Sequence, residues 1–365
     1  MPDLDIMVLP AGNPQNPPRF LLQTGGQWRD LGSAAGLGDL GRLQGRIDEQ
    51  LQSDMESLDV AGGGVFAVGQ YFSLLYEPIF PASFQRVLKA AEPANAGDPP
   101  PLLRLHLDPS LDWIPWEVAH DGDAFLGLRF RVARLPIVPH REAPPIKDPW
   151  PVTKIYNFLG EWVLDDGQLS GWQKTFPTDG ASNVSEQRLP EQPVNRFPRV
   201  ADVEKAANDG HIVHFTCHGA IKDAGTAGGS CWTLNHKQPV NPQFKIHADV
   251  VGGLKTRLPK TQPLVFGNAC GSSGQAAGAG GLVNSFGGLF ILAGASGFVG
   301  TCAPIAKARA IEFATRFYHY LLVKGDPIST ALWRAKDELS KATPEDPSPL
   351  FYCQYGSPES RYALG

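Results

Sequence analysis

No segment of this 365-residue sequence is apolar for long enough to suggest a membrane helix or a secretory signal. The first residues, MPDLDIMVLPAG, carry acidic side chains where a signal peptide carries Lys or Arg, and their apolar run is too short. The longest apolar segment, residues 281–300, is interrupted by Asn284, Ser285 and many glycines, which favours a buried helix followed by a buried strand. We therefore expect a cytoplasmic protein with no membrane partner.

Basic clusters and internal repeats are also missing. The chain has 32 Lys and Arg against 37 Asp and Glu, a net charge of -5, and no basic stretch of the kind that follows a phosphate backbone. This argues against nucleic acid as a direct partner. No repeat is visible, which argues against a solenoid or sensor array. The hydrophobic fraction of 42% is enough to bury a substantial core, so the composition predicts a globular protein.

Cysteine is scarce, with five residues that all lie in the second half of the chain. A cytoplasmic chain keeps its thiols reduced, so each cysteine is interpreted as a nucleophile, a metal ligand or a buried apolar residue before it is assigned to a disulfide. The five are Cys217, Cys231, Cys270, Cys302 and Cys353.

A proline-rich segment divides the sequence. Residues 139–151 hold five prolines, which fit neither a central strand nor a helix interior, so we place a domain boundary after residue 148. Residues 1–148 are predicted to form an α+β region, because some stretches alternate apolar and polar residues and others space apolar residues by three and four. Strands are predicted at residues 4–9, 20–23, 102–107 and 129–135, helices at residues 40–58 and 84–91, and a strand passing into a helix at residues 65–75.

The segment L-D-W-I-P-W-E, residues 111–117, places two tryptophans around a proline and ends in Glu117. Tryptophan clusters mostly contribute buried area. We interpret this segment as a structural corner and not as a site.

Residues 149–365 alternate apolar strands with helices, which is typical of an α/β domain. We predict a mainly parallel sheet covered by helices on both faces. Strands are predicted at residues 153–159, 211–216, 264–267 and 297–302, helices at residues 200–208, 249–254, 281–292, 307–323 and 327–339, and a hairpin at residues 230–234.

Two of the predicted strands end in reactive side chains. The sequence H-I-V-H-F-T-C-H-G leads to His218, and L-V-F-G-N-A-C-G leads to Cys270, 52 residues later. If these strands are neighbours in a parallel sheet, both side chains arrive at the same edge. An imidazole there can take the thiol proton, and the thiolate is a nucleophile.

A glycine directly follows each reactive residue. Gly219 and Gly271 would let the backbone turn sharply, so that the N–H groups of Gly219 and Cys270 point at one spot. Two such donors would stabilise the oxyanion that forms when a thiolate attacks an amide carbonyl.

Each of these residues has a simpler interpretation. Taken alone, Cys270 at a strand end is typical of a small buried side chain, and His218 of a structural histidine. The pairing of His-Gly and Cys-Gly at two strand ends favours a catalytic pair.

A zinc site is the competing chemistry, since His211, His214, Cys217 and His218 lie within eight residues. On a helix the three histidines would share a face and could bind zinc. The sequence Ile-Val-His-Phe-Thr is β-type, however, and on a strand His211 points away from His214. We predict no metal or cofactor, and interpret His214 as a core residue or as a partner beneath His218.

These motifs resemble the CHAT family of caspase-like cysteine proteases, relatives of caspases, separase and gingipains. The resemblance runs from about residue 101, inside the α+β region, to the end of the chain. Its motifs are L-R-L-H-L-D-P-S-L-D-W-I-P-W-E with F-L-G-L, H-F-T-C-H-G, A-D-V-V-G-G-L, L-V-F-G-N-A-C-G-S-S-G, G-G-L-V-N-S-F, A-L-W-R-A-K and L-F-Y-C-Q-Y-G-S-P. A histidine about 50 residues before the nucleophilic cysteine is a known feature of caspases.

The resemblance implies a caspase-like fold, with His218 as the catalytic base, Cys270 as the nucleophile, and the N–H groups of Gly219 and Cys270 as oxyanion donors. It also implies regulated peptide cleavage, often in bacterial antiviral defence or cell death. The chain departs from the family in two places: Gly271 stands where many members have an acidic residue, and residues 302–304 lack a tryptophan found there. The first departure leaves substrate preference open.

The sequence therefore predicts a cysteine endopeptidase that cleaves a protein partner, which we expect to be encoded nearby. Without sensor repeats, activation is expected to depend on a second protein or on processing. The alternative is a catalytically silent caspase-like module that binds other proteins.

Overall fold

A computed structural model describes residues 3–10, 18–33, 79–91, 98–112, 114–137, 148–159, 175–176, 184–189, 199–220, 231–234, 245–247, 251, 261–269, 285–303, 305 and 307–365. The chain forms two compact units, Met1–Ile137 with Leu332–Tyr352, and Val138–Ala331 with Cys353–Gly365. The domain boundary after residue 148 stays a prediction, because a compact unit is not necessarily a region that folds independently.

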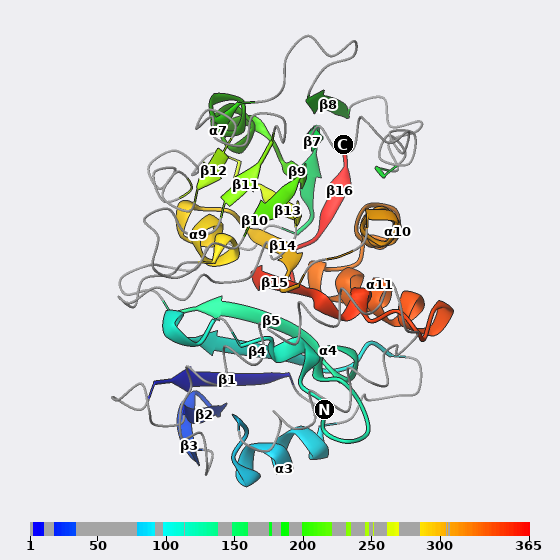
Figure 1. Ribbon diagram of the computed structural model, residues 1–365. Coiled ribbons are helices and arrows are strands. Elements are labelled where there is room, and N and C mark those ends of the chain that lie inside the picture. Colours follow the sequence, from blue (N-terminus) through cyan, green and yellow to red (C-terminus); the bar gives the residue numbers. More distant parts are fainter. Residues whose placement is uncertain are drawn as a thin grey trace. The chain divides into compact units, whose positions relative to one another are not determined.

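The first unit is built on strands in the order β3-β2-β1-β4-β5 (Figure 1). β1 pairs with β2, and β2 with β3, in antiparallel fashion, whereas β1–β4 and β4–β5 are parallel. The strands are β1 (Leu4–Leu9), β2 (Arg19–Thr24), β3 (Gln27–Ser33), β4 (Leu102–Leu107) and β5 (Arg131–Pro136). The α-helices are α3 (Ala82–Ala90), α4 (Leu126–Arg129) and most of α11 (Ile328–Ala342). Three short 3-10 helices also belong to this unit: η1 (Pro109–Leu111), η2 (Trp116–Val118) and η6 (Ser348–Phe351).

The predicted strands and the helix near residue 84 are confirmed in this unit, with one shift. The strand predicted from residue 129 begins at Arg131, because Arg129 is the last residue of helix α4. The predictions for residues 40–58 and 65–75 lie outside the described residues.

The tryptophan-containing corner is structural, as predicted, for the residues that the structure describes. Trp116 is buried against Phe20 and Phe80. Glu117 is also buried and accepts hydrogen bonds on both carboxylate oxygens from Arg134, one of them from Nε at 3.0 Å. A buried carboxylate needs such a partner, so the corner is held by an internal ion pair.

The second unit contains a sheet in the order β15-β14-β13-β9-β7-β8. The pairs β14–β13, β13–β9, β9–β7 and β7–β8 are all parallel. Its strands are β7 (Lys154–Leu159), β8 (Ser185–Leu189), β9 (Ile212–Thr216), β13 (Leu264–Asn268), β14 (Gly297–Thr301) and β15 (Tyr352–Gly356).

Helices and small sheets surround these strands. The helices are α7 (Val200–Asp209), α9 (Phe286–Ala293), α10 (Lys307–Tyr318), which continues as the π-helix η5 (His319–Val323), and the start of α11. An antiparallel sheet is formed by β10 (His218–Ala220), β11 (Cys231–Thr233) and β12 (Lys245–His247), and a parallel pair by β6 (Trp150–Val152) and β16 (Tyr362–Leu364). The predicted fold class, an α/β fold with a mainly parallel sheet flanked by helices, is confirmed.

Alternate residues of β9 and β13 face different helices. Phe215 and Val265 lie in a core cluster with α7, α9 and the small antiparallel sheet, while His214 and Phe266 contact Tyr318 of α10. α7 and α9 accordingly lie on one side of the strands and α10 on the other (Figure 1). The sheet is thus covered on both faces, as its apolar strands require.

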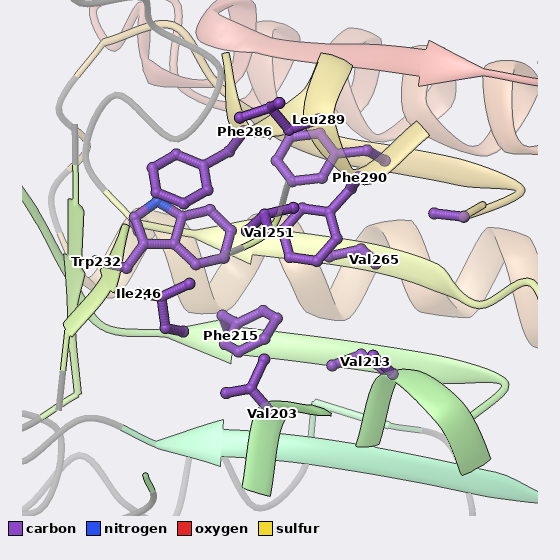
Figure 2. Packing of buried hydrophobic residues seen from close by; sticks show 14 of the residues in the cluster. Val203, Val213, Phe215, Trp232, Ile246, Val251, Val265, Phe286, Leu289 and Phe290 are labelled. Carbon is purple, nitrogen blue, oxygen red and sulfur yellow. The ribbon is translucent and has the colours of Figure 1, made fainter. Parts of the chain in front are cut away.

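Trp232 is the largest side chain in the core cluster between the sheet and α9 (Figure 2). Its ring stacks on Phe286 of α9, with centroids 4.4 Å apart and planes at 17°, and also contacts Phe215 of β9. Because Trp232 belongs to β11, its contacts pack the small antiparallel sheet against the larger, mainly parallel sheet.

Several boundaries differ from the sequence-based predictions. α9 begins at Phe286 and not at residue 281, because the Ser285 hydroxyl caps it by accepting a hydrogen bond from the Gly288 N–H at 3.1 Å. Strand β8 was not predicted, since its sequence, SEQRL, is almost entirely polar. Of the predicted helix at residues 249–254, the structure describes only Val251. No helix in the described ranges is long and apolar enough to cross a membrane.

Candidate active site

The two strands that lead to the predicted catalytic residues are adjacent. β9 and β13 pair in parallel, in a register that runs from Ile212 opposite Leu264 to Thr216 opposite Asn268. One residue further, the Cys217 N–H donates a hydrogen bond to the Asn268 carbonyl at 3.3 Å. The predicted neighbour relation between the strands is therefore confirmed.

In this register, His218 and Cys270 lie equally far along the sequence from the ends of their strands. Each follows the last register pair, Thr216 and Asn268, by two residues. His218 is the first residue of β10. Cys270 and Gly271 lie outside the described residues, so the contact between the two catalytic side chains stays a prediction.

Gly219 does not form the sharp turn that the sequence suggested. It is the middle residue of β10 and lies opposite Trp232 of β11 in an antiparallel pair. The burial of Trp232 fixes β11, and pairing with β11 keeps Gly219 extended. Cys217 separates β9 from β10, and these two strands belong to different sheets.

The end of β13 is tied to two further elements. The Asn268 side-chain amide donates a hydrogen bond to the Ala310 carbonyl of α10 at 3.2 Å. The Thr301 hydroxyl, at the end of β14, donates to the Ala269 carbonyl at 3.0 Å. Sequence reasoning did not single out Thr301, because a side-chain bond between strands depends on a register that the sequence does not reveal.

His214 is a core residue, as predicted. It is fully buried, with Nδ1 hydrogen-bonded to the Tyr318 hydroxyl and Nε2 to the Thr216 hydroxyl, each at 3.0 Å. Both ring nitrogens are therefore occupied. The described part of the chain contains no group of three or more His, Cys, Asp or Glu side chains that could hold a metal ion.

Burial lowers the pKa of His214 to about 3, because desolvation disfavours its charged form. Burial likewise raises the pKa of Tyr318 well above its usual value. His214 and Tyr318 are thus both neutral at physiological pH. Their hydrogen bond joins β9, shortly before His218, to α10.

The buried neutral His214 predicts acid-dependent stability. Between pH 6.5 and 3 the unfolded chain binds a proton at this position and the folded chain does not, so stability falls as the pH falls through this window. From pH 7 to pH 4.5 the contribution of His214 to the free energy of unfolding should fall by about 2–3 kcal/mol. Urea unfolding at both pH values should show a smaller loss in His214→Phe than in the unmodified chain. An equal loss in both proteins would contradict this assignment.

One comparison with known proteins covers both strand-end motifs. The family model of the CHAT domain matches residues 180–357, which include β9, β13 and both predicted catalytic positions. The resemblance to the CHAT family that was seen in the sequence is thereby confirmed over residues 180–357. A search of curated sequences found no matching protein.

Solved structures of cysteine proteinases are also similar to the chain. A chain of the Saccharomyces cerevisiae separase–securin complex matches with 14% identity and a TM-score of 0.47, over 80% of this chain and 18% of that one. Gingipain R, an Arg-specific cysteine proteinase, matches with 11% identity and a TM-score of 0.49, over 79% of this chain and 70% of that one. The complex of Porphyromonas gingivalis RgpB pro- and mature domains matches with 12% identity and a TM-score of 0.40, over 77% and 70%. The chain spans 15–18% of the length of the yeast chains that it matches.

Proposed function

We propose that this chain is a cysteine endopeptidase in which Cys270 is the nucleophile and His218 the general base. The observation that carries the proposal is the parallel pairing of β9 and β13, which brings the two strand ends together in matching register. The match of residues 180–357 to the CHAT family model supports it.

In the proposed mechanism, the His218 imidazole takes the proton of the Cys270 thiol. The thiolate attacks the carbonyl carbon of the scissile peptide, and the N–H groups of Gly219 and Cys270 bind the resulting oxyanion. In this proposal Gly219 offers its N–H from an extended residue of β10 and not from a turn. The intermediate collapses to a thioester while His218 gives its proton to the departing amine. Water then attacks the thioester and loses its proton to His218, and the released Cys270 thiolate takes that proton back as the carboxylic acid product leaves.

We further propose that the substrate is a protein encoded nearby, that a second protein activates the peptidase in the cytoplasm, and that the pair serves bacterial defence or regulated cell death. The departure at Gly271 leaves substrate preference to be determined. The alternative is a silent CHAT domain that only binds other proteins.

The rate at which iodoacetamide alkylates Cys270 tests the pairing with His218. Measured across pH 5.5–9.5, the apparent pKa of this thiol is expected below the value of about 8.5 for a free cysteine, because a nearby imidazolium stabilises the thiolate. In His218→Ala it should rise towards that value, whereas His211→Ala, which changes a half-buried histidine at the other end of β9, should leave it in place. An identical pH profile for the unmodified chain and His218→Ala would overturn the proposal.

A further inference from the structure

The two residues that precede Cys270 are held by three neighbouring elements. The Asn268 carbonyl accepts from the Cys217 N–H at the end of β9, and the Asn268 side chain donates to α10. The Ala269 carbonyl accepts from the Thr301 hydroxyl at 3.0 Å. Asn268, Ala269 and Thr301 are buried, so these bonds are shielded from competing water.

The bond from Thr301 lies beyond the regular pairing of its strand. The last register pair between β13 and β14 is Gly267 with Gly300. Thr301 is the next residue of β14, and its side chain reaches a carbonyl two residues past the paired Gly267. A side chain thus holds the backbone at the point where the strand ladder ends.

The carbonyl that Thr301 holds belongs to the peptide unit that carries the Cys270 N–H. The six atoms of a peptide unit are coplanar, and in the trans form that non-proline residues adopt, the C=O and N–H bonds point in opposite directions. Fixing the Ala269 oxygen towards β14 therefore fixes the direction of the Cys270 N–H, which is one of the two proposed oxyanion donors.

We propose that Thr301 is a positioning residue that orients the Cys270 N–H for oxyanion binding. The inference rests on the proposed peptidase function and adds a residue to it. Thr301 acts through the Ala269 carbonyl and not on the substrate. Its loss should therefore impair reactions that pass through an oxyanion and spare reactions that need only the thiolate.

Two reagents separate these cases. p-Nitrophenyl acetate acylates a thiolate through a tetrahedral oxyanion: the C–S bond forms and p-nitrophenolate leaves. Iodoacetamide alkylates the same thiolate by direct displacement of iodide, with no oxyanion. The rate constants for modification of Cys270 by each reagent can be measured on the full chain by mass spectrometry of the peptide that contains it.

Removing one oxyanion donor typically slows acyl transfer about 100- to 1000-fold. A donor that is still present but points in the wrong direction should therefore slow acyl transfer by a smaller factor, about 10- to 100-fold. In Thr301→Val, which keeps the shape of the side chain and removes the hydroxyl, acylation should slow by that factor while alkylation stays within about twofold. Thr301→Ser, which keeps the hydroxyl, should acylate at nearly the original rate.

Three outcomes would overturn the inference: unchanged acylation in Thr301→Val, an equal slowing of both reactions, or no recovery in Thr301→Ser. His218→Ala is measured alongside to separate this inference from the function on which it rests. If His218→Ala changes neither reaction, the dyad itself is wrong. If His218→Ala slows both and Thr301→Val slows neither, only the role of Thr301 is wrong.

Discussion

Replacing Cys270 with alanine is expected to lower the rate of peptide-bond cleavage by at least about 10⁴-fold, because the acyl-enzyme can no longer form. The measurement is digestion of a mixed peptide library by an activated sample of the full chain at high enzyme concentration, with cleavage products counted by mass spectrometry. Any bond that the unmodified chain cuts should remain intact in Cys270→Ala.

Cys302→Ala is the matched control for this experiment. Cys302 directly follows the end of β14, is partly exposed, and forms no disulfide with the cysteines that the structure describes. It takes no part in the proposed chemistry, so its replacement should leave cleavage within about twofold. Persistent cleavage in Cys270→Ala, or loss of cleavage only in Cys302→Ala, would show that the nucleophile is misassigned.

Replacing Trp232 with alanine is expected to lower the free energy of unfolding by about 3–5 kcal/mol, the usual effect of truncating a fully buried tryptophan. Trp232 is 1% exposed and packs against aromatic rings from β9, α9 and β14 (Figure 2). Truncation would leave a cavity at the junction of the main sheet and the small antiparallel sheet. Urea unfolding followed by far-ultraviolet circular dichroism measures the change.

Trp232→Phe separates loss of volume from loss of aromatic packing. Phenylalanine can still stack on Phe286, so this variant should lose less than half as much stability as Trp232→Ala. Since β11 pairs with β10, which begins at His218, Trp232→Ala should also slow alkylation of Cys270 at neutral pH. A stability change below about 1 kcal/mol in Trp232→Ala would contradict the role assigned to this side chain.

The main strands of the second unit were predictable because their sequences are continuous apolar runs. β9 and β13, with Ile-Val-His-Phe-Thr and Leu-Val-Phe-Gly-Asn, match the predicted ranges to within one residue. β8 was not predicted, because an edge strand has few buried side chains and so shows no clear apolar pattern in its sequence. β10 was not predicted because three residues carry no pattern. Its pairing also depends on the burial of Trp232, which follows Ala220 by 12 residues.

The sequence was enough to predict the two catalytic residues of the candidate site, but not the hydrogen bonds and backbone conformation around them. The motifs ending in His218 and Cys270 are visible in the sequence, and their adjacency required only that β9 and β13 be neighbours, which they are. The hydrogen bond from Thr301 to the Ala269 carbonyl is different in kind. It depends on where pairing of β14 with β13 ends, and no local pattern encodes that point. For the same reason, the extended conformation of Gly219 contradicted the turn that a glycine after a histidine suggested.

A mixture of peptidyl acyloxymethyl ketones tests the central claim most directly, because these reagents trap a cysteine peptidase only when its thiolate and its general acid act together. After incubation with an activated sample of the full chain, mass spectrometry should find a single covalent adduct on Cys270, and none in His218→Ala. The contrary result would be an adduct on another cysteine, or no adduct from a Cys270 that iodoacetamide still alkylates; the second of these would identify the domain as a silent binding module.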